Sequence, residues 1–370
     1  VNILDGILNN KNININTELV KVYKDWIETH PFDSGNGWVM PWSQLEMVPG
    51  DEIVKAARAK SDTAVIVIGR TAGEDRDAKA DKGSWFLTNE EEALLEVVSK
   101  YFEKTAVLLN VGNIIDMNWV EKYNIKAVMY VWQGGQEGGN AVADLLSGKV
   151  NPSGRLSDTI AYDIADYPAH KNFGSPTCNL YQEDIYVGYR YFETFARNRV
   201  MYPFGFGLSY TDFDINTVSV SENDRKITAE VRVTNIGKTS GREVVQMYFE
   251  APQGKLGKSV RELCGFAKTG IINPGESESV VLEVKESDLS AYDDSGITGN
   301  KSCFVLEQGE YNLYIGKCVR CAEKVFTYNV PETVITQRLT EAMPPDKGDE
   351  KKLKISCPPA VKITAVKIKK

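Results

Sequence analysis

The sequence predicts an α/β protein with two domains: a mostly parallel α/β sandwich followed by an all-β sandwich of the immunoglobulin or fibronectin type III kind. Up to about residue 213, short apolar runs alternate with segments of helical spacing, and beyond that point the apolar period shortens to two. The length of 370 residues also favours two domains, because single cores usually stop growing at roughly 250–300 residues.

The first domain is expected over residues 1–213. The predicted strands are Ala64–Ile68, Ala106–Leu109 and Ala127–Val131, and the predicted helices are Asp51–Ala59, 88–102, Ile115–Lys122 and Glu137–Leu146. Thr88 and Glu91 have the spacing of a capping box at the start of the second of these helices. Because strands apolar on both faces alternate with helices, a parallel sheet covered on both sides is expected.

Loops at the carboxyl ends of parallel strands carry the functional residues in such sheets. Three loops follow the three predicted strands, namely Arg70–Asp77, Asn110–Asn113 and Trp132–Gly139. We expect them to meet at one edge of the sheet.

The second domain is expected over residues 214–330. Five segments alternate apolar with polar residues and two weaker ones do so less clearly, which gives about the seven strands of a fibronectin-type sandwich. The five are Ile227–Thr234, Glu243–Phe249, Ser277–Val284, Glu310–Ile315 and Lys324–Tyr328, and the two weaker ones are Thr217–Ser221 and Glu262–Ala267. Residues 331–370, with Pro344-Pro345 and Pro358-Pro359, are expected to form an extended tail or linker.

Composition excludes some classes of function. The net charge of −8, with basic residues concentrated only in 347–370, argues against nucleic acid as a partner. The longest apolar runs, Thr63–Ile68 and Ala106–Asn110, are too short to span a membrane.

Cysteine usage argues against a metal site. The pair Cys318 and Cys321 forms one CxxC, and the chain has two histidines, whereas a structural zinc ion needs four ligands. Unpaired thiols in a reducing compartment are the favoured interpretation, and a cytoplasmic location is therefore expected.

The most informative stretch is residues 61–77. An apolar strand leads directly into a loop with four consecutive charged residues, Glu74 to Asp77. One interpretation is a solvated turn whose charges pair locally, since exposed charged loops are common. The other is a catalytic loop in which the Glu74 carboxyl acts.

Several motifs in a fixed order separate these interpretations. They are Val65–Asp77, Lys82–Leu87, Leu108–Gly112, Trp132–Gly139, Gly148–Leu156, Tyr181–Phe192 and Tyr202–Phe213. In this order they make the chain similar to family 3 of the glycoside hydrolases over nearly its whole length. The resemblance implies an α/β sandwich followed by a fibronectin-type domain, in agreement with the pattern of strands and helices.

The resemblance implies retaining hydrolysis of β-glycosides by two carboxylates from two domains. In this family the acid/base Glu lies in the sandwich, and the residue here that matches is Glu74, in Gly73-Glu74-Asp75-Arg76. The nucleophilic Asp belongs to a (β/α)8 barrel, in a segment reading roughly S-D-W. The nearest string, Lys24-Asp25-Trp26, lies in a predicted helix, so the nucleophile is not assigned to Asp25.

Other residues near these motifs have two interpretations each. Trp85 and Trp132 are candidates for contacts with the sugar or leaving group, and core packing is the alternative for both. Glu137 is expected at a helix N-terminus and is the fallback acid. Arg190 is expected to pair with Glu183 or Asp184.

The expected function is therefore that of the acid/base half of an exo-acting β-glucosidase. We expect no cofactor, a β-glucoside or oligosaccharide as substrate, and a barrel domain or chain with the nucleophile as partner; a homo-oligomer is left open. The sandwich is expected to lack its first strand, and the chain alone to be inactive. The alternatives are a β-xylosidase or α-arabinofuranosidase of the same family, and a non-catalytic carbohydrate-binding or scaffolding module.

Overall fold

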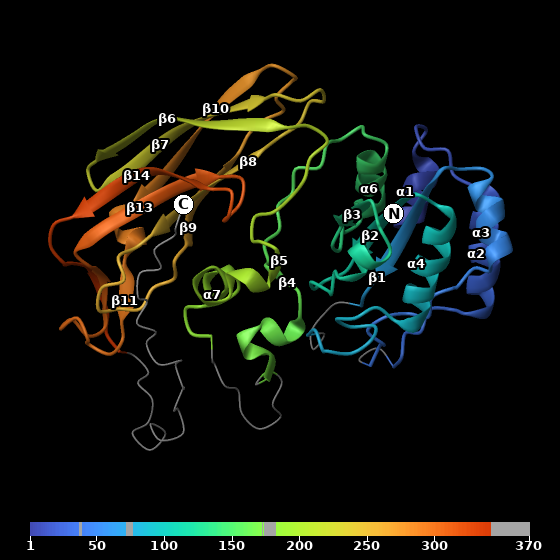
Figure 1. Ribbon diagram of the computed structural model, residues 1–370, viewed down its shortest axis with the longest axis horizontal. Helices are drawn as coiled ribbons and strands as arrows, with labels where there is room; N and C mark the ends of the chain where they lie inside the picture. Colours follow the sequence, from blue (N-terminus) through green and yellow to red (C-terminus); the bar gives the residue numbers. More distant parts are fainter. Residues whose placement is uncertain (37–38, 72–76, 172, 174–182, 342–370) are drawn as a thin grey trace. The chain divides into compact units, whose positions relative to one another are not determined.

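The computed structural model describes residues 1–36, 39–71, 77–171, 173 and 183–341 (Figure 1). The chain divides into two compact units, one formed by Val1–Val150 with Tyr162–Ile164 and the other by Asn151–Ala161 with the chain from Ala165 onward. The boundary between the two compact units thus lies near residue 150. The spacing of apolar residues changes from helical to strand-like only near residue 213.

The first unit is built on a parallel three-stranded sheet, as predicted. Its strands are β1 (Thr63–Gly69), β2 (Lys104–Asn110) and β3 (Ala127–Tyr130), in the order β1-β2-β3. The helices are α1 (Ile3–Asn9), α2 (Thr17–Thr29), α3 (Asp51–Arg58), α4 (Asn89–Tyr101), α5 (Trp119–Lys122) and α6 (Gly138–Leu146). Helix α3 packs beside α4, and α1 packs against α6 (Figure 1).

Helix α4 begins with the capping box that the sequence predicts. The Thr88 hydroxyl accepts a bond from the Glu91 amide at 3.0 Å, and the Glu91 carboxylate accepts one from the Thr88 amide at 2.9 Å. Leu94, Leu95 and Val98 are buried one or more turns later, as their helical spacing requires.

Helix α5 is shorter than the expected Ile115–Lys122. Ile115 and Met117 are buried core residues outside the helix. The Trp119 indole donates a hydrogen bond to the backbone carbonyl of Asp116 at 2.6 Å, and this contact fixes the turn that precedes the helix.

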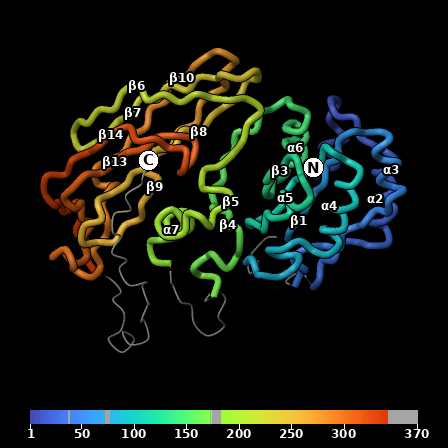
Figure 2. Tube along the Cα trace, viewed as in Figure 1, coloured from blue at the N-terminus to red at the C-terminus, as the bar shows by residue number. Residues whose placement is uncertain are grey.

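The second unit contains the expected β-sandwich, and all seven expected strands are present (Figure 2). One sheet has the order β10-β7-β6 and the other the order β14-β13-β8-β9, both antiparallel throughout. The strands are β6 (Phe213–Asn223), β7 (Lys226–Asn235), β8 (Val244–Glu250), β9 (Glu262–Lys268), β10 (Ser277–Lys285), β13 (Gly309–Gly316) and β14 (Glu323–Val330).

Other elements were not expected from the sequence. The strands β11 (Ala291–Asp293), β12 (Cys303–Leu306) and β15 (Val334–Arg338) form a third sheet, so the segment expected as a tail begins with a strand that pairs with β12. Ahead of the sandwich, β4 (Ile160–Ala161) pairs with β5 (Val200–Tyr202), and α7 (Tyr189–Phe195) lies between them in the chain. Short 3-10 helices cover Ile164–Asp166, Pro168–Lys171, Arg197–Arg199 and Glu286–Leu289.

Residues before the sandwich pack onto one of its sheets. Tyr189 stacks on Phe204 with ring centroids 4.4 Å apart, and both rings lie against Tyr248 of β8. The Tyr189 hydroxyl also accepts a hydrogen bond from the Leu263 amide of β9 at 2.9 Å. The Tyr248 side chain is consequently fully buried.

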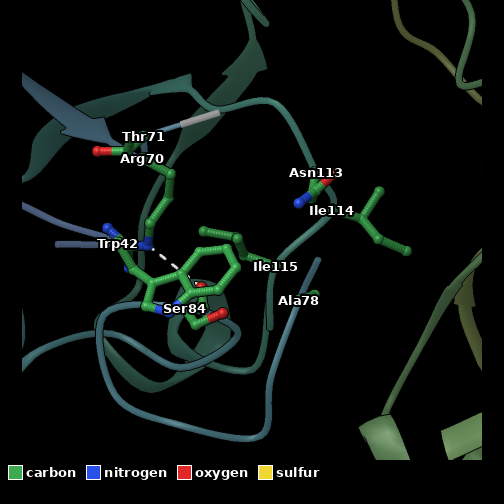
Figure 3. A pocket seen from close by; sticks show the side chains of 8 residues that line it. All are labelled: Trp42, Arg70, Thr71, Ala78, Ser84, Asn113, Ile114 and Ile115. Carbon is green, nitrogen blue, oxygen red and sulfur yellow. Dashed lines mark hydrogen bonds between the residues drawn. The ribbon is translucent and has the colours of Figure 1, made fainter. Parts of the chain in front are cut away.

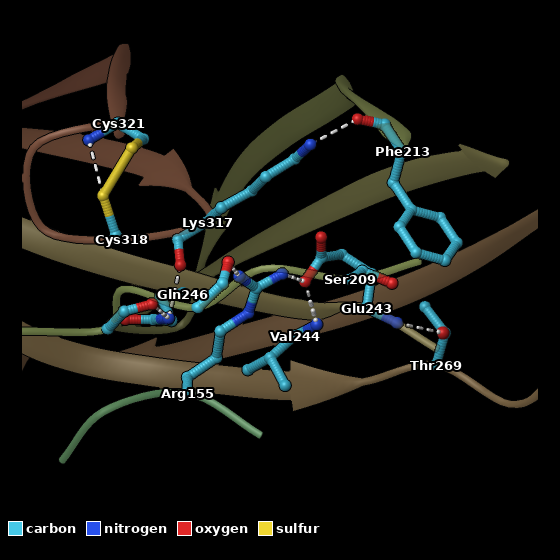
Figure 4. Close-up of polar contacts among 12 residues, drawn as sticks. Arg155, Ser209, Phe213, Glu243, Val244, Gln246, Thr269, Lys317, Cys318 and Cys321 are labelled. Carbon is cyan, nitrogen blue, oxygen red and sulfur yellow. Dashed lines mark hydrogen bonds and ion pairs between the residues drawn. A yellow bond between two sulfur atoms is a disulfide. The ribbon is translucent and has the colours of Figure 1, made fainter. Parts of the chain in front are cut away.

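Polar contacts of Arg155 and Lys317 add to this packing (Figure 4). Arg155 pairs with the buried Glu243, just before β8, and donates to the backbone carbonyl of Gly207. In the turn after β13, the Lys317 ammonium donates to the carbonyl of Phe213 at 2.5 Å, and the Lys317 carbonyl accepts from Gln246 at 2.6 Å.

The expectation of unpaired thiols is wrong for Cys318 and Cys321, which form a disulfide in the turn between β13 and β14 (Figure 4). This turn brings the two residues close enough for a bond, with 5.0 Å between their Cα atoms. Cys264 and Cys303 are free thiols. Within the described part of the chain, no helix is long and apolar enough to cross a membrane.

Candidate active site

The carboxyl ends of β1, β2 and β3 lie side by side, as expected. Gly69 pairs with Asn110, and Leu109 pairs with Tyr130. The contacts continue past the strands, because the Arg70 amide donates to the Asn110 carbonyl at 3.1 Å and the Val131 amide to the Leu109 carbonyl at 3.0 Å. The loops after the three strands therefore start from one edge of the sheet.

Glu74, the expected proton donor, lies outside the described residues, as do its neighbours from Ala72 to Arg76. The residue before this stretch is well anchored. The Thr71 amide donates to the carbonyl of Trp42 at 2.8 Å, and its hydroxyl donates to the carbonyl of Pro41 at 2.8 Å.

A small pocket lies beside this anchor (Figure 3). The residues that line it come from the ends of β1 and β2 and from the segments around them: Trp42, Arg70, Thr71, Ala78, Ser84, Asn113, Ile114 and Ile115. As bounded by the described residues, the cavity measures about 10 Å³, roughly the space of one water molecule. It is therefore too small to be a sugar subsite by itself.

The side chain of Arg70, the residue directly after β1, makes five hydrogen bonds. Its Nε donates to the Ser84 carbonyl at 3.2 Å (Figure 3). The two remaining nitrogens donate to the carbonyls of Gly69 at 2.8 Å and Phe86 at 3.3 Å, and to the two carboxylate oxygens of Glu91 at 2.5 and 2.9 Å. Sequence reasoning missed this pair, since it assigned Glu91 to the capping box and Arg70 to a charged loop.

Trp85 is buried, with 2% of its surface exposed. This placement agrees with core packing, the alternative left open for it, and gives no support to a contact with the leaving group. The Trp85 carbonyl accepts a hydrogen bond from the Asp116 amide at 3.0 Å. This bond connects a segment between β1 and α4 with the segment that follows β2.

Trp132 is half-buried just beyond β3 and has a backbone φ of +52°. For a bulky side chain this left-handed conformation is an outlier that the surrounding structure must enforce. The Trp132 ring lies against Tyr130, with centroids 4.9 Å apart. Trp132 thus lies at the edge where the strand ends meet, and its role as a sugar contact stays a prediction.

Three further residues have defined places. Glu137 occupies the N-cap position of α6, and its carboxylate accepts from Asn140 at 2.6 Å rather than from the helix backbone. Arg190 forms an ion pair, but its partner is Glu262 at 3.1 Å and not Glu183 or Asp184. Asp25 lies in α2 and pairs with Lys21 one turn earlier, which agrees with leaving the nucleophile unassigned.

Two carboxyls of the first unit have raised pKa values. Partial burial, with a smaller contribution from the charge of Glu91, raises the pKa of Glu46 to about 7. Burial also raises the pKa of Asp116, although hydrogen bonds from Asn118 and Met117 oppose the shift. No group of three His, Cys, Asp or Glu side chains suited to a metal ion occurs among the described residues.

The chain matches a known class of enzyme domain. The family model for the glycosyl hydrolase family 3 C-terminal domain matches residues 4–210, and that for the fibronectin type III-like domain matches residues 243–318. The chain belongs to glycosyl hydrolase family 3.

The most similar relatives found are named as beta-glucosidases. A beta-glucosidase of Ruminococcus albus is 48% identical over 93% of this chain, and beta-glucosidase A of Butyrivibrio fibrisolvens is 38% identical over 90% of it. The crystal structure of a beta-glucosidase from Paenibacillus barengoltzii has a TM-score of 0.89 and 49% identity over 92% of this chain. Beta-glucosidase 3B of Thermotoga neapolitana in complex with glucose has a TM-score of 0.80 and 36% identity over 90% of it.

These relatives are much longer than the chain. The chain spans 36% and 45% of the two curated relatives, and 38% and 47% of the two solved structures. The matches show the family and the two domain types.

Proposed function

We propose that this chain is the acid/base half of a retaining exo-β-glucosidase, with Glu74 as the proton donor and a barrel domain outside the chain as the source of the nucleophile. One observation supports the proposal: β1 ends at Gly69, at the edge where the ends of the three strands lie side by side. Glu74, which matches the acid/base Glu of the family, follows five positions later in the sequence. The names of the relatives support a β-glucoside as substrate.

The chemistry requires one carboxyl to act twice. In retaining hydrolysis the acid protonates the leaving oxygen and then, as a base, activates water, while a second carboxylate about 5–5.5 Å away forms the glycosyl-enzyme bond. A carboxyl on a loop can meet this demand once a second domain supplies the opposing carboxylate and excludes water. Trp132 is the residue we propose as a sugar contact from this side.

The test is Glu74→Gln in the complete enzyme. Loss of the acid should lower kcat/KM by about 10²–10⁴-fold for alkyl glucosides, and much less for aryl glucosides whose leaving group needs no protonation. Equal and small losses for both substrates would instead favour a scaffolding module.

A second test uses the chain by itself. Because the nucleophile lies outside it, the purified 370-residue chain should not release product from an aryl glucoside at any pH. Turnover above that of a Glu74→Gln control would show that the chain holds a complete site.

Comparing glucosides, xylosides and arabinofuranosides in the complete enzyme separates the β-glucosidase from its alternatives within the family.

A further inference from the structure

We propose that the Cys318–Cys321 disulfide is a site of thiol–disulfide exchange, at which a dithiol reductant opens the bond and thereby loosens the packing of α7. The site lies in the turn between β13 and β14, within the second unit. It shares no residue with the candidate active site, so the inference does not rest on the proposed function.

The two sulfur atoms differ in access. Cys318 is buried, with 2% of its surface exposed, whereas Cys321 is exposed. A thiolate that opens a disulfide must reach one of its two sulfurs, and access decides in part which one it attacks. The Sγ atom of Cys321 is therefore the point of attack, and Cys318 is the leaving group.

The leaving sulfur has a hydrogen-bond donor in place. The Cys321 amide donates to the Sγ atom of Cys318 at 3.1 Å (Figure 4). A hydrogen bond to the charged form of a group favours that form, and a better-stabilised thiolate leaves faster. Because the donor is already aligned in the oxidised state, the thiolate that forms on Cys318 is stabilised without rearrangement of the turn.

The exchange takes place in two steps. In the first, a thiolate of the dithiol forms a bond to Cys321 Sγ, the bond between the two cysteines breaks, and its electron pair leaves on Cys318 Sγ, which then takes a proton from water. In the second, the other thiolate of the dithiol attacks its own sulfur in the mixed disulfide and releases Cys321 as a thiolate, which is protonated in turn. The protein disulfide gains two electrons and two protons, and the dithiol is oxidised to a disulfide.

Stability does not explain the position of this bond. It joins residues three positions apart, and a loop this short loses little chain entropy when it is closed. A disulfide with an exposed sulfur is also of the kind that reductants open most readily. What the bond controls is the local shape of the two residues that it encloses, Val319 and Arg320.

Both enclosed residues contact the chain ahead of the sandwich. The Val319 amide donates to the Phe204 carbonyl at 3.2 Å. The Arg320 guanidinium donates through Nε to the Glu193 carboxylate of α7 at 2.8 Å, and through Nη2 to the Arg197 carbonyl, just beyond α7, at 2.6 Å. The shape of the turn therefore sets the contacts at the end of α7.

Glu193 makes α7 sensitive to this turn. Its side chain is 4% exposed, and its second cationic partner, Arg197, is 66% exposed and 3.4 Å away. Arg320, at 2.8 Å and 23% exposed, is the closer and better shielded of the two partners. When the turn relaxes and Arg320 moves, a buried carboxylate loses its charged hydrogen bond, which is costly. The helix must then shift to let water reach this carboxylate.

The first experiment identifies the sulfur that is attacked. The 370-residue chain, carrying Cys178→Ser and Cys357→Ser so that these two thiols cannot exchange, is treated with excess reduced glutathione, quenched with acid and labelled with a maleimide. Peptide mass spectrometry should find glutathione on Cys321 and the maleimide on Cys318, in a ratio of about ten to one or more over the reverse pattern. Equal amounts of both patterns, an excess of the reverse one, or a chain that reacts only when urea unfolds it would overturn the inference.

The second experiment measures the coupling to α7. Reduction with dithiothreitol should speed hydrogen exchange of the amides in α7 by about 3–10-fold, the order expected for a short-loop disulfide, and leave those of β7 unchanged. Arg320→Gln keeps the disulfide but loses the ion pair. In this variant α7 should exchange fast before reduction and gain less than about twofold from it.

Cys318→Ser/Cys321→Ser is the control for dithiothreitol itself, and it should exchange at the rate of the reduced chain with and without the reagent. An α7 whose exchange does not respond to reduction, or responds equally in Arg320→Gln, would show that the bond is not coupled to this helix and would overturn the proposal. The comparison of the oxidised and reduced unaltered chain decides even if Arg320→Gln does not fold.

Discussion

The fold raises the pKa of the Glu46 carboxyl. Burial is the main cause of its raised pKa of about 7, and the charge of Glu91 contributes to it. Burial of the Tyr23 hydroxyl, together with the charge of Glu46, raises the pKa of Tyr23 as well. Near neutral pH an ionised Glu46 therefore lies in surroundings that favour the protonated form.

This shift predicts how stability depends on pH. A group whose pKa is higher in the folded state stabilises the fold below its unfolded pKa, and this contribution is lost as the pH rises through the folded value. For Glu46 the loss should occur between its ordinary pKa of about 4.5 and about 7.

Glu46→Gln should therefore raise the free energy of unfolding by on the order of 1–2 kcal/mol at pH 8, and change it little at pH 4.5. Urea denaturation at both pH values measures the difference. A gain of the same size at the two pH values would show that ionisation is not the cause.

Asp293 shows the opposite shift. It is fully buried, and burial by itself acts to raise the pKa of this carboxyl. Hydrogen bonds from the amides of Gly296 and Thr298 and from the Thr298 hydroxyl outweigh that effect and hold the pKa at about 2. Its contribution to stability is present above the ordinary pKa of about 3.8 and is lost as the pH falls towards 2.

Asp293→Asn should accordingly destabilise the second unit by about 2 kcal/mol or more at pH 7. The effect should shrink as the pH falls towards 2, and urea denaturation over this pH range measures it. A loss that does not change with pH would assign the effect to shape rather than charge.

At the scale of elements, two neighbouring glycines of α6 have different surroundings. A Cβ on Gly139 would lie 1.9 Å from the carbonyl oxygen of Asn2, at the start of α1, whereas a Cβ on Gly138 would meet no atom within 4 Å. The close approach of α1 and α6 therefore depends on Gly139.

Gly139→Ala should destabilise the first unit by about 1–3 kcal/mol, because α1 must move away from α6. Gly138→Ala is the matched control and should be neutral or stabilising by about 0.4–1 kcal/mol. Thermal unfolding of the two variants measures the contrast. Equal effects would show that helix propensity, and not the contact with α1, decides the result.

Elements were predictable where the pattern is local. The parallel strands, the capping box of α4 and the seven strands of the sandwich each follow from spacing within a few residues. The strands β11, β12 and β15 are three to five residues long, too short for alternation to show. Ile115 and Met117 lie in the segment predicted as a helix but fill the core from a loop, so α5 is short.

The site was predictable only in part. The shared edge of the three strand ends follows from the parallel sheet, but the assignment of Glu74 came from family resemblance. The Arg70–Glu91 pair joins residues 21 positions apart, and the partner of Arg190 lies on a distant strand. Such pairs arise from tertiary packing, which no local pattern records.

At the scale of the whole molecule, the turn closed by the Cys318–Cys321 disulfide is part of the packing within the second unit. In this turn the Val319 amide donates to the Phe204 carbonyl at 3.2 Å, and Arg320 pairs with Glu193 at 2.8 Å. Residues of the turn therefore hold the segment that precedes the sandwich.

Replacing both cysteines by serine should cost about 1–2 kcal/mol, since the closed loop is short. It should also speed hydrogen exchange of the amides between Tyr189 and Phe213 more than that of β7. Reduction of the unaltered chain by a dithiol should have the same effect. Unchanged exchange in that segment would show that the turn holds its shape without the bond.

The burial of the Tyr248 ring depends on Tyr189 and Phe204, which precede the sandwich in the chain. This affects which part of the chain recombination can move into another protein. A gene segment encoding only residues from 214 onward would yield a sheet with an uncovered aromatic face, prone to self-association. A segment beginning near residue 151 would include the residues that cover this aromatic face. Recombination that moves this sandwich between proteins should therefore retain the sixty or so residues ahead of it, so the exchangeable part is longer than the strands suggest.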